Sequence, residues 1–485
     1  MIDLAKPFIQ LFKTPRSQYV FDVNQNEILP VSVESFDFLK QCMDGKADIG
    51  STSIEELQML MQNGYLRTES VVQEIQHPYT PYLKYLLERK LRKITLQVTQ
   101  ACNLRCKYCI YSDDVNPHQR SHSSRRMTWA TAKKGIDFLW EHSVDSPEVN
   151  VGFYGGEPLL EFALIKRIVA YAKKTFDGKK ISFSLTTNGT LITDEMINFL
   201  SEENIHLVVS LDGPKEIHDK SRVFADGRGS FDTVIGNVKK FRDRVPEYAK
   251  RIAFSVVVDP LNDYDCINEI TIMAKDMNSH NFLAAIVDKD YDNNCDSLIF
   301  SEEYTWKSRY HEFLALLSLF NRYPEECVSA LARSSLGLLV KKINQKRASA
   351  PLRPVDVPSG PCIPGQLRLF VNADGRFFPC ERVSELSTAT CIGSLDNGFD
   401  VEQASKLLNI GKLTPQACKR CWSFRSCTLC AKRADISSEG LSAEYKLAHC
   451  ANVQMTTYNV LRKTIFAHEV NSFYRDQVRL ERISL

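Results

Sequence analysis

The segment Ala101-Cys-Asn-Leu-Arg-Cys-Lys-Tyr-Cys109 places three cysteines close together in the chain. Three thiolates at this spacing can ligate three irons of a [4Fe–4S] cube, and the fourth iron then has no protein ligand. A cluster that only transfers electrons normally has four cysteines. Cys102, Cys106 and Cys109 therefore predict a cluster in which one iron binds another molecule.

A zinc site is the alternative for these cysteines. Zinc sites in proteins usually have four Cys or His ligands, as in Cys₄ or Cys₂His₂ sets. The three cysteines have no fourth Cys or His close by in the sequence except His118 and His122. The number of ligands therefore favours an iron–sulfur cluster over zinc.

The composition is typical of a soluble globular protein with two or three domains. The chain has 485 residues, of which 44% are hydrophobic and 25% charged, and its formal net charge is +2. This charge predicts neither a nucleic-acid nor a membrane surface. No stretch reads as a secretory signal or is long enough to span a bilayer. Fifteen cysteines without an export signal predict reduced thiols, metal sites and a cytoplasmic location.

Residues 1–75 form a separate unit according to their hydrophobic pattern. The pattern predicts a hairpin over 18–29, a helix over 33–43 that Gly45 ends, a second helix that begins with a capping box of Ser53 and Glu56, and a strand over 65–67. A plain packing domain and a DNA-binding winged helix both fit this order. A DNA reader should carry basic residues on its second helix, but Glu55 and Glu56 stand there.

After a linker over residues 76–92, short apolar strands alternate with amphipathic helices. The expected strands are 94–98, 149–153, 181–185, 207–209, 252–258 and 282–286. Repeated strand–helix units fold as a parallel α/β sheet, and a barrel or partial barrel is its natural closure. We therefore expect residues 93–300 to form such a barrel, with its chemistry at the carboxyl ends of the strands.

Sequence motifs follow the first four of these strands directly. The cysteine segment follows the first strand and Gly155-Gly156-Glu157-Pro158 the second, while Thr187-Asn188-Gly189 ends the third and Ser210-Leu211-Asp212-Gly213-Pro214 the fourth. Glycines let a backbone approach a ligand closely, and Glu157 can offer a carboxylate to a cationic group. Each motif alone also fits a plain turn. Their common position predicts one ligand-binding edge.

Residues 356–485 contain a second set of cysteines, after a helical bridge over residues 301–355. These are Cys362, Cys380, Cys418, Cys421, Cys427, Cys430 and Cys450. Seven cysteines exceed what one zinc ion or one cluster binds. A zinc ribbon of the two Cys-x-x-Cys pairs is an alternative, but its loop is short and it leaves three cysteines without a role. Four further cysteines lack ligand spacing and are expected to be structural: Cys42, Cys266, Cys295 and Cys327.

The cysteine segment and the strand-end motifs resemble the radical S-adenosylmethionine (SAM) superfamily. This resemblance implies a partial (β/α)6 radical SAM barrel, in which the open iron chelates and reduces SAM. Residues 1–75 resemble the RiPP recognition element, a winged-helix-like fold that holds the leader of a precursor peptide. Residues 356–485 resemble a SPASM domain, which holds two auxiliary [4Fe–4S] clusters. The implied fold class is α/β, with SAM and three [4Fe–4S] clusters as cofactors.

The resemblance also implies which residues bind SAM. The Gly-Gly-Glu segment is similar to the one that binds the amino group of SAM. Ser210 is placed near its methionine portion or ribose and Arg222 near its carboxylate, while Tyr108 resembles the aromatic residue that packs on the adenine. For Asn188, a turn role and a SAM contact are equally open. The implied set is Tyr108, Gly155, Gly156, Glu157, Asn188, Ser210 and Arg222.

By the same resemblance, the C-terminal cysteines divide between two auxiliary clusters. The first set is Cys418, Cys421, Cys427 and Cys450, and the second is Cys362, Cys380 and Cys430. Cys391 or a substrate thiolate is a candidate for the unfilled position, although the apolar context of Cys391 favours burial. The last pair encloses two residues where the family pattern has three, which leaves the ligand sets open. Glu381 stands where sulfatase-maturing relatives have a base.

The order of the three units resembles radical SAM/SPASM peptide maturases, and among them the ranthipeptide and sactipeptide maturases of cysteine-rich peptides. The implied reaction is a thioether crosslink from a Cys sulfur to a carbon of a ribosomally made precursor peptide, through a 5′-deoxyadenosyl radical. An auxiliary cluster would take up the second electron. A flavodoxin or ferredoxin would supply reducing electrons, and the N-terminal unit would concentrate the peptide at the barrel.

Three other functions fit parts of this pattern. A carbon–carbon crosslinking maturase and a sulfatase-type maturase that forms formylglycine share the motifs. A non-enzymatic zinc or peptide-binding scaffold is the third. The sequence leaves open the acceptor residue and its carbon (α, β or γ), the number of rings, the roles of Glu381 and Cys391, the electron donor and the oligomeric state.

Overall fold

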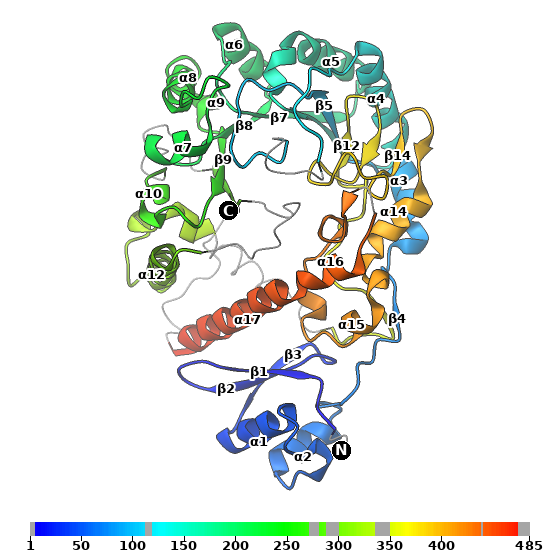
Figure 1. Cartoon of the computed structure of the whole chain (residues 1–485), viewed down its shortest axis with the longest axis vertical. Helices are drawn as coiled ribbons and strands as arrows, with labels where there is room; N and C mark the ends of the chain where they lie inside the picture. The colour runs from blue at the N-terminus through cyan, green and yellow to red at the C-terminus, as the bar shows by residue number, and fades with distance from the viewer. Residues whose placement is uncertain are drawn as a thin grey trace.

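The computed structural model describes residues 5–111, 119–270, 281–287, 300–334, 350–437 and 440–473. Figure 1 shows a sheet with helices on its outer side and a C-terminal part beside one edge of it. The N-terminal unit lies at the far end, below the long helix α17 (Cys450–Phe473). Within the described residues, no helix is both long and apolar enough to cross a membrane.

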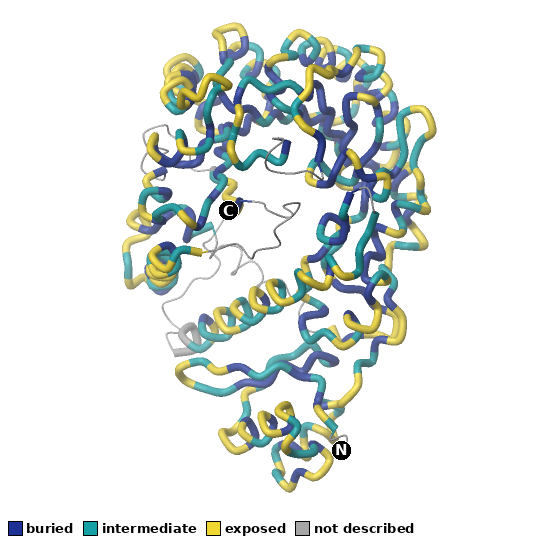
Figure 2. The backbone as a smooth tube through the Cα atoms, in the orientation of Figure 1, coloured by how far each residue is buried: buried dark blue, intermediate teal, exposed yellow. Residues whose placement is uncertain are grey.

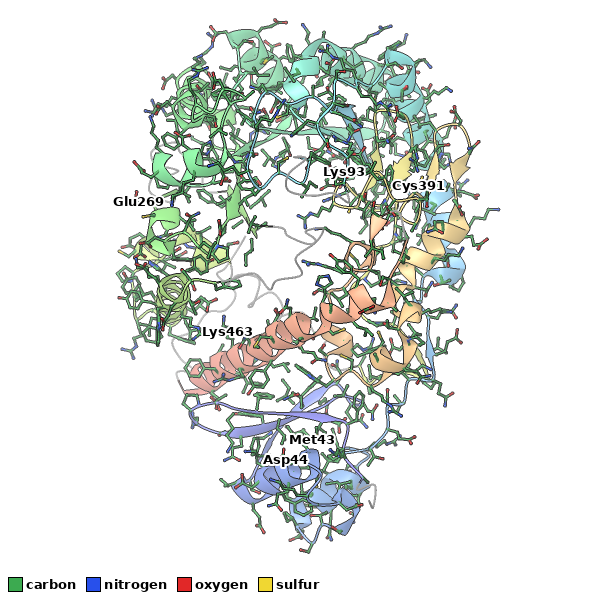
Figure 3. The ribbon with its side chains drawn as sticks, in the orientation of Figure 1. Met43, Asp44, Lys93, Glu269, Cys391 and Lys463 are labelled. Carbon is green, nitrogen blue, oxygen red and sulfur yellow. The ribbon has the colours of Figure 1, made fainter. Side chains whose placement is uncertain are left out.

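The N-terminal unit is a three-stranded antiparallel sheet with two helices. The elements are β1 (Ile9–Lys13), β2 (Gln18–Asp22), β3 (Glu27–Val31), α1 (Val33–Met43) and α2 (Glu55–Gln62). The predicted hairpin and first helix are confirmed. Met43 and Asp44 mark the end of α1 in Figure 3. Buried side chains from both layers, among them Val20 and Leu39, form a core of their own.

The predicted capping box of Ser53 and Glu56 is wrong, because α2 begins without a side-chain cap. The Glu56 carboxylate instead accepts hydrogen bonds from the backbone N–H and the hydroxyl of Ser32, which is the N-cap residue of α1. It also accepts one from the hydroxyl of Ser35. Glu56 therefore joins the two helices, a long-range role that a local spacing rule does not reveal.

Residues 65–67 do not form the predicted strand. Leu66 has a left-handed backbone with a φ of +58°, and its N–H donates to the carboxylate of Asp22 on β2. A non-glycine residue with positive φ does not continue a strand. The third strand of this sheet is instead β1, which pairs with β2.

The large sheet contains six parallel strands in chain order, which confirms the α/β partial barrel. The strands are β5 (Lys93–Thr99), β6 (Glu148–Gly155), β7 (Lys180–Thr187), β8 (His206–Ser210), β9 (Ala253–Val258) and β10 (Asn281–Ile286). Each strand is hydrogen-bonded to the next one along the chain. All six predicted strands are therefore present.

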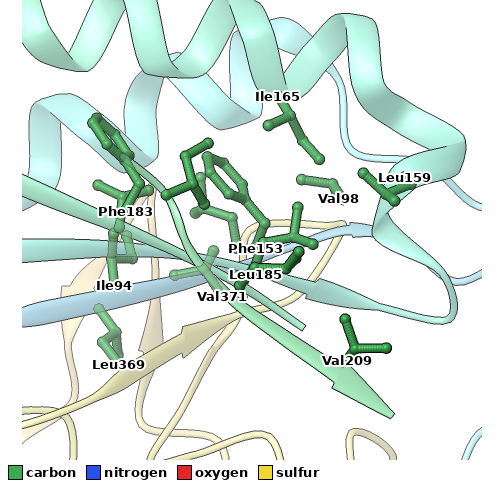
Figure 4. Packing of buried hydrophobic residues seen from close by; sticks show 14 of the residues in the cluster. Ile94, Val98, Phe153, Leu159, Ile165, Phe183, Leu185, Val209, Leu369 and Val371 are labelled. Carbon is green, nitrogen blue, oxygen red and sulfur yellow. The ribbon is translucent and has the colours of Figure 1, made fainter. Parts of the chain in front are cut away.

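Helices cover the outer face of this sheet (Figure 1). The main ones are α4 (Trp129–His142), α5 (Phe162–Thr175), α6 (Asp194–Glu202) and α8 (Phe231–Arg244). Alternate strand residues point to one face of a sheet, and Ile94, Phe153 and Leu185 share a buried core with Ile165 of α5 (Figure 4). The tube in Figure 2 is accordingly mostly buried along the strands and exposed on the outer helices.

The C-terminal part extends the open edge of the large sheet. It adds β12 (Leu369–Val371), parallel to β5, and β13 (Phe377–Phe378), antiparallel to β12. Leu369 and Val371 join the same buried core as the barrel strands (Figure 4). The barrel and the C-terminal part are therefore parts of one continuous sheet.

The predicted helical bridge contains α12 (Glu302–Leu319). The helix predicted at Leu336, Leu338 and Leu339 lies outside the described residues. Lys463 of α17, labelled in Figure 3, forms an ion pair with Glu312 of α12 at 2.7 Å. This ion pair connects the bridge to the C-terminal helix.

The N-terminal sheet shares a hydrophobic core with the C-terminal part. Its buried members include Phe12, Tyr19, Phe21 and Val23 from the N-terminal unit and Leu352, Val357, Cys418 and Phe424 from the C-terminal part. Tyr458 and Leu461 of α17 pack against it, and the hydroxyl of Tyr19 donates to Glu469 at 2.7 Å. This shared core fixes the N-terminal unit to the C-terminal part.

Candidate active site

The loops after β5, β6, β7 and β8 meet at one edge of the sheet. The N–H of Glu157 after β6 donates to the carbonyl of Ala101 at 2.9 Å. The side-chain amide of Asn188 after β7 donates to Asn103 at 2.9 Å. The N–H of Arg105 donates to the carbonyl of residue 223, beyond β8, at 2.8 Å. The four motifs therefore share one edge, as their positions in the sequence predict.

Cys102, Cys106 and Cys109 are half-buried, and their thiols are close enough to influence one another. Burial raises the pKa of Cys102 and of Cys106 to about 11, and that of Cys109 in the same direction. Negative charge on a neighbouring thiol raises each pKa further, whereas the charge of Arg222 lowers that of Cys106. Buried neighbouring thiols ionise when a metal takes up their charge. These three suit a metal cluster.

The donor set fits a cube better than a single ion. Among the described residues, no three His, Cys, Asp or Glu side chains are grouped as the ligands of one metal ion. In a [4Fe–4S] cube each cysteine ligates a different iron, so its ligands need not converge on one point. His122 lies 3.7 Å from the sulfur of Cys109, and His118 lies outside the described residues.

Gly155 and Gly156 are required because their loop packs directly on the cysteine segment. Gly155 has a φ of +147°, and a Cβ there would lie 2.1 Å from the carbonyl oxygen of Thr99. A Cβ at Gly156 would lie 2.2 Å from the carbonyl oxygen of Ala101. The sequence predicts that these glycines let the backbone approach a ligand. In the structure, the backbone that lies against them is that of Thr99 and Ala101.

The carboxylate of Glu157 is fully buried and occupied by protein donors. One oxygen accepts hydrogen bonds from the N–H of Leu159 at 3.0 Å and the hydroxyl of Thr187 at 2.7 Å. The other accepts from the N–H of Asn188 at 2.7 Å. Burial raises its pKa to about 6, although these donors oppose the shift. Glu157 therefore joins the ends of β6 and β7. The sequence predicts a carboxylate that binds a cationic group of a ligand, and the structure adds these hydrogen bonds to protein donors.

Tyr108, Asp212 and Arg222 form a hydrogen-bonded cluster beside the cysteine segment, in which Asp212 and Arg222 are buried. Nε of Arg222 donates to Oδ2 of Asp212 at 2.9 Å, and the hydroxyl of Tyr108 donates to the same oxygen. Oδ1 of Asp212 accepts the N–H of Val257 on β9 at 2.9 Å. Arg222 is 7% and Asp212 2% exposed. Asp212, which the sequence showed only as part of a turn motif, is the carboxylate that organises this cluster.

Asn188 and Ser210 stand at the ends of β7 and β8. The side chain of Asn188 donates to Asn103 and lies 3.9 Å from the sulfur of Cys102. Its oxygen accepts the N–H and the hydroxyl of Thr190, which closes the local turn. Asn188 thus both stabilises the local turn and contacts the cysteine segment. Ser210 is half-buried at the last position of β8.

Four C-terminal cysteines gather around Lys446. Its Nζ lies 3.4 Å from the sulfur of Cys418, and its carbonyl oxygen lies 3.9 Å from that of Cys450. Burial raises the pKa of Cys427 to about 11 and also raises that of Cys450. The charge of Lys446 lowers both, while Cys418 and Cys421 raise both. The structure thus brings together the four cysteines that the resemblance assigns to the first auxiliary cluster.

Cys362, Cys380 and Cys430 form a second group near Arg368. Burial raises the pKa of Cys380 to about 12, and the charges of Glu381 and Cys430 raise it further. Burial also raises the pKa of Cys430, with Cys362 as a neighbour. The negative charges of Glu381, Cys380 and Cys362 raise the pKa of Arg368. These three cysteines are the ones that the resemblance assigns to the second auxiliary cluster.

Glu381 and Cys391 flank this second group. Oε1 of Glu381 pairs with Arg368 at 2.7 Å, whereas its Oε2 is buried without a hydrogen-bond partner among the described residues. Cys391, labelled in Figure 3, packs against the same phenylalanine cluster as Cys380 and donates its thiol to the carbonyl of Gly393 at 3.5 Å. Cys391 is half-buried there, so it is less buried than its apolar sequence context suggests.

The other cysteines lie away from these groups. Cys42 is buried in the core of the N-terminal unit, and Cys266 packs against the core of the barrel. Cys327 is exposed, and Cys295 lies outside the described residues. Cys42 and Cys266 therefore contribute to hydrophobic packing, and Cys327 lies at the surface.

A buried ion pair that the sequence did not reveal joins the barrel to the C-terminal part. Nε of Arg120 donates to Oε1 of Glu385 at 2.7 Å, with the two side chains 8% and 3% exposed. The same oxygen accepts the side-chain amide of Gln97 on β5 at 2.5 Å. The guanidinium of Arg120 also lies 4.0 Å from the ring centre of Tyr111. The pair therefore holds the chain after the cysteine segment against the C-terminal part.

Comparison with protein families identifies the domain that contains the strand-end motifs. Residues 96–270 match the family model of the Radical SAM superfamily. Residues 96–270 form a radical SAM domain. This domain implies SAM and one [4Fe–4S] cluster as cofactors, and Cys102, Cys106 and Cys109 are the described residues with the donor set for that cluster.

Named relatives of the radical SAM domain are enzymes, as the sequence predicts for this chain. The chain is 32% identical to the serine-type anaerobic sulfatase-maturating enzyme of Bacteroides thetaiotaomicron over 40% of this chain and 45% of that protein. It is 32% identical to the radical SAM cyclopropyl synthase TigE of Paramaledivibacter caminithermalis over 35% of this chain and 36% of that protein. The chain thus spans less than half the length of either relative.

A solved structure extends the similarity in fold beyond this domain. The chain is similar to the solved structure of native anSMEcpe with bound AdoMet, with 22% sequence identity and a TM-score of 0.57. The superposition covers 78% of this chain and 99% of that one. The α/β fold of the radical SAM class, with its mostly parallel sheet, is therefore confirmed.

His218 makes this edge sensitive to acid. Its ring is fully buried, Nδ1 accepts the N–H of Asp212 at 3.4 Å, and Nε2 lies 3.0 Å from the hydroxyl of Ser230. Burial and the charge of Arg222 lower its pKa from 6.5 to about 4. The folded protein favours the neutral ring of His218. The folded state therefore keeps its full stability above pH 6.5, and protonation of His218 lowers the free energy of unfolding as the pH falls toward 4. The shift amounts to about 3 kcal/mol in the free energy of unfolding.

We expect the wild type to lose about 2 kcal/mol more stability than His218→Gln between about pH 7.5 and pH 5, because glutamine does not titrate. Urea unfolding at both pH values measures the difference. Equal losses in the two proteins would show that His218 is not the group responsible.

Proposed function

We propose that the chain is a radical SAM peptide maturase that forms thioether bonds in a ribosomally made, cysteine-rich precursor peptide. The supporting observation is the second C-terminal cysteine group with Glu381 beside it. Three cysteines leave one position of a cluster for a substrate thiolate. The buried Oε2 of Glu381, which has no partner among the described residues, can accept the proton of that thiol.

Three groups of cysteines hold the proposed cofactors. Bound SAM supplies a 5′-deoxyadenosyl radical that removes a hydrogen atom from an unactivated carbon, and the clusters carry the electrons. The proposed ligands are Cys102, Cys106 and Cys109 for the SAM cluster, Cys418, Cys421, Cys427 and Cys450 for the first auxiliary cluster, and Cys362, Cys380 and Cys430 for the second.

The proposed SAM-binding residues have two kinds of role. Glu157 and Arg222 have buried protein partners, so they position the strand ends and the cysteine segment. Tyr108 is part of the cluster with Arg222, because its hydroxyl donates to Asp212. The proposed SAM-binding set remains Tyr108, Gly155, Gly156, Glu157, Asn188, Ser210 and Arg222, and within it Glu157 and Arg222 also hold the site together.

The N-terminal unit is the proposed binding site for the leader of the peptide. In the described structure β3 lies at one side of its sheet and pairs only with β2. An extended peptide can add to such an edge as a further strand. Holding the leader there raises the effective concentration of the rest of the peptide at the barrel. A flavodoxin- or ferredoxin-type protein is the proposed reductant.

Formylglycine formation is a second candidate. The relative from Bacteroides thetaiotaomicron is named as a sulfatase-maturating enzyme, and the solved anSMEcpe structure shares the fold. On a cysteine substrate, formylglycine formation replaces the sulfur with an aldehyde oxygen, whereas a thioether keeps the sulfur. The fate of the sulfur therefore separates the two functions.

The test is an oxygen-free incubation of the full chain with SAM, dithionite and a short cysteine-rich precursor peptide that carries a leader. We expect a product that has lost two hydrogen atoms per crosslink, retains its sulfur and no longer reacts with iodoacetamide. Loss of sulfur would support formylglycine formation instead. Loss of hydrogen with thiols still open to alkylation would support a carbon–carbon crosslink or, if an aldehyde is detected, the oxidation of a serine to formylglycine.

The proposed base gives this test a matched pair of variants. Glu381→Gln should slow thiol consumption by about 10²–10⁴-fold while deoxyadenosine still forms. Glu325→Gln, an exposed acid paired with Arg333, should change neither rate. Equal thiol consumption in Glu381→Gln and the wild type would remove Glu381 from the reaction.

A further inference from the structure

Lys446 is a buried cation at the centre of the first C-terminal cysteine group. It belongs to the short helix α16 (Ala443–Ala448), next to α15 (Pro415–Lys419) and the start of α17 (Figure 1). The residue is 2% exposed. Its ammonium group donates to the hydroxyl of Thr414 at 2.5 Å and to the sulfur of Cys418 at 3.4 Å.

No carboxylate compensates this charge in the part of the chain that the structure describes, where the two recorded partners of the Lys446 ammonium are neutral groups. The nearby Arg425 shows the contrast, because its guanidinium binds both oxygens of Asp356, at 2.9 and 2.7 Å. A buried charge without a partner is costly. The placement of Lys446 therefore points to an anion that it faces in the working protein.

A [4Fe–4S] cluster with four thiolate ligands is such an anion. It carries two negative charges when oxidised and three after it gains one electron. A fixed positive charge and an N–H···S hydrogen bond favour the more negative form, and hydrogen bonds to sulfur and net charge are the factors that set such potentials. Lys446 supplies both factors at Cys418.

We propose that Lys446 is a positioning residue that raises the reduction potential of the cluster held by Cys418, Cys421, Cys427 and Cys450, so that it accepts an electron from the substrate. This inference rests on the proposed function. Crosslinking removes two hydrogen atoms from the peptide. One leaves as a hydrogen atom to the 5′-deoxyadenosyl radical. The other leaves as a thiol proton to a base and as an electron, which passes to this cluster through the second cluster, where the proposed function binds the substrate thiolate.

The experiment compares reduction potentials in the full chain, reconstituted without oxygen from iron and sulfide. Dithionite titrations followed by electron paramagnetic resonance are run on the wild type, Lys446→Met and Lys446→Gln, all without peptide. We expect one cluster signal in Lys446→Met to bind its electron about tenfold more weakly, which is a fall of about 59 mV. The other signals should be unchanged, and Lys446→Gln, which keeps a donor, should shift less.

Lys412→Met is the matched control. Lys412 lies in the same C-terminal part, but it is exposed and paired with Glu74, so its removal should move no potential. Iron analysis accompanies every sample. Unchanged potentials in Lys446→Met with full iron content would overturn the inference. Loss of about four irons in both Lys446 variants would also overturn it, because the lysine would then serve assembly.

These outcomes are separate from the proposed function. The potentials are measured without any peptide, so a failure to form thioethers leaves the inference about Lys446 standing. Normal thioether formation with an unshifted potential in Lys446→Met would refute the inference alone.

Discussion

Replacing Cys102, Cys106 and Cys109 with alanine is expected to abolish the formation of 5′-deoxyadenosine from SAM. These three half-buried cysteines lie at the edge where four strand-end loops meet. Without them no cysteine set remains at this edge to hold a cluster with an open iron. Chromatography of the reaction products should show deoxyadenosine only at the background rate, a larger effect than that of any other substitution considered.

Iron analysis sharpens this prediction. The wild type should hold about twelve irons and the triple variant about eight, because one cube is lost and two remain. Cys327→Ala is the control, since Cys327 is exposed and belongs to none of the three groups. Deoxyadenosine formation that survives in the triple variant would place the SAM cluster elsewhere.

Replacing Asp212 with asparagine should destabilise the folded protein by about 3–5 kcal/mol. The substitution leaves the guanidinium of Arg222 buried at 7% exposure without its carboxylate partner. It also weakens the acceptor of the Tyr108 hydroxyl. An effect of this size is a large part of the stability of an ordinary domain, and urea unfolding of the two proteins measures it.

Asp226→Asn is the matched control for this substitution. Asp226 pairs with Arg228 at 2.8 Å, but both side chains are largely exposed, and such pairs contribute at most about 1 kcal/mol. The two substitutions remove the same charge from the same region of the chain. Equal effects would mean that the buried ion pair of Asp212 is not what stabilises the strand ends.

The barrel and the cysteine groups were predictable because each carries its signal locally. A strand such as 252–258 is a continuous apolar run, typical of strands buried in a parallel sheet. The segment around Cys102 contains all three expected cluster ligands within a few residues, so its spacing alone indicates a metal cluster. Position after a strand then places a motif at one edge, because parallel strands share their carboxyl ends. These features can be predicted without knowing which distant residues are in contact.

The parts that were missed depend on contacts between distant residues. Arg120 and Glu385 are 265 positions apart, and neither stands in a recognisable pattern. Glu56 has the spacing of a capping box, but it binds the start of the other helix. For Glu157, the sequence did not reveal that its carboxylate also accepts hydrogen bonds from Thr187 and Asn188 at the end of the next strand. A spacing rule identifies such residues but not their partners.

The shared core has a consequence for engineering this chain. Phe12, Tyr19 and Phe21 pack in one core with Cys418, a proposed ligand of the first auxiliary cluster. A chimaera that grafts a foreign N-terminal unit onto residues 76–485 would therefore leave apolar surface exposed beside Cys418. Exchanging this unit between chains of the same architecture requires moving the aromatic face of β1 and β2 together with the C-terminal residues that pack on it.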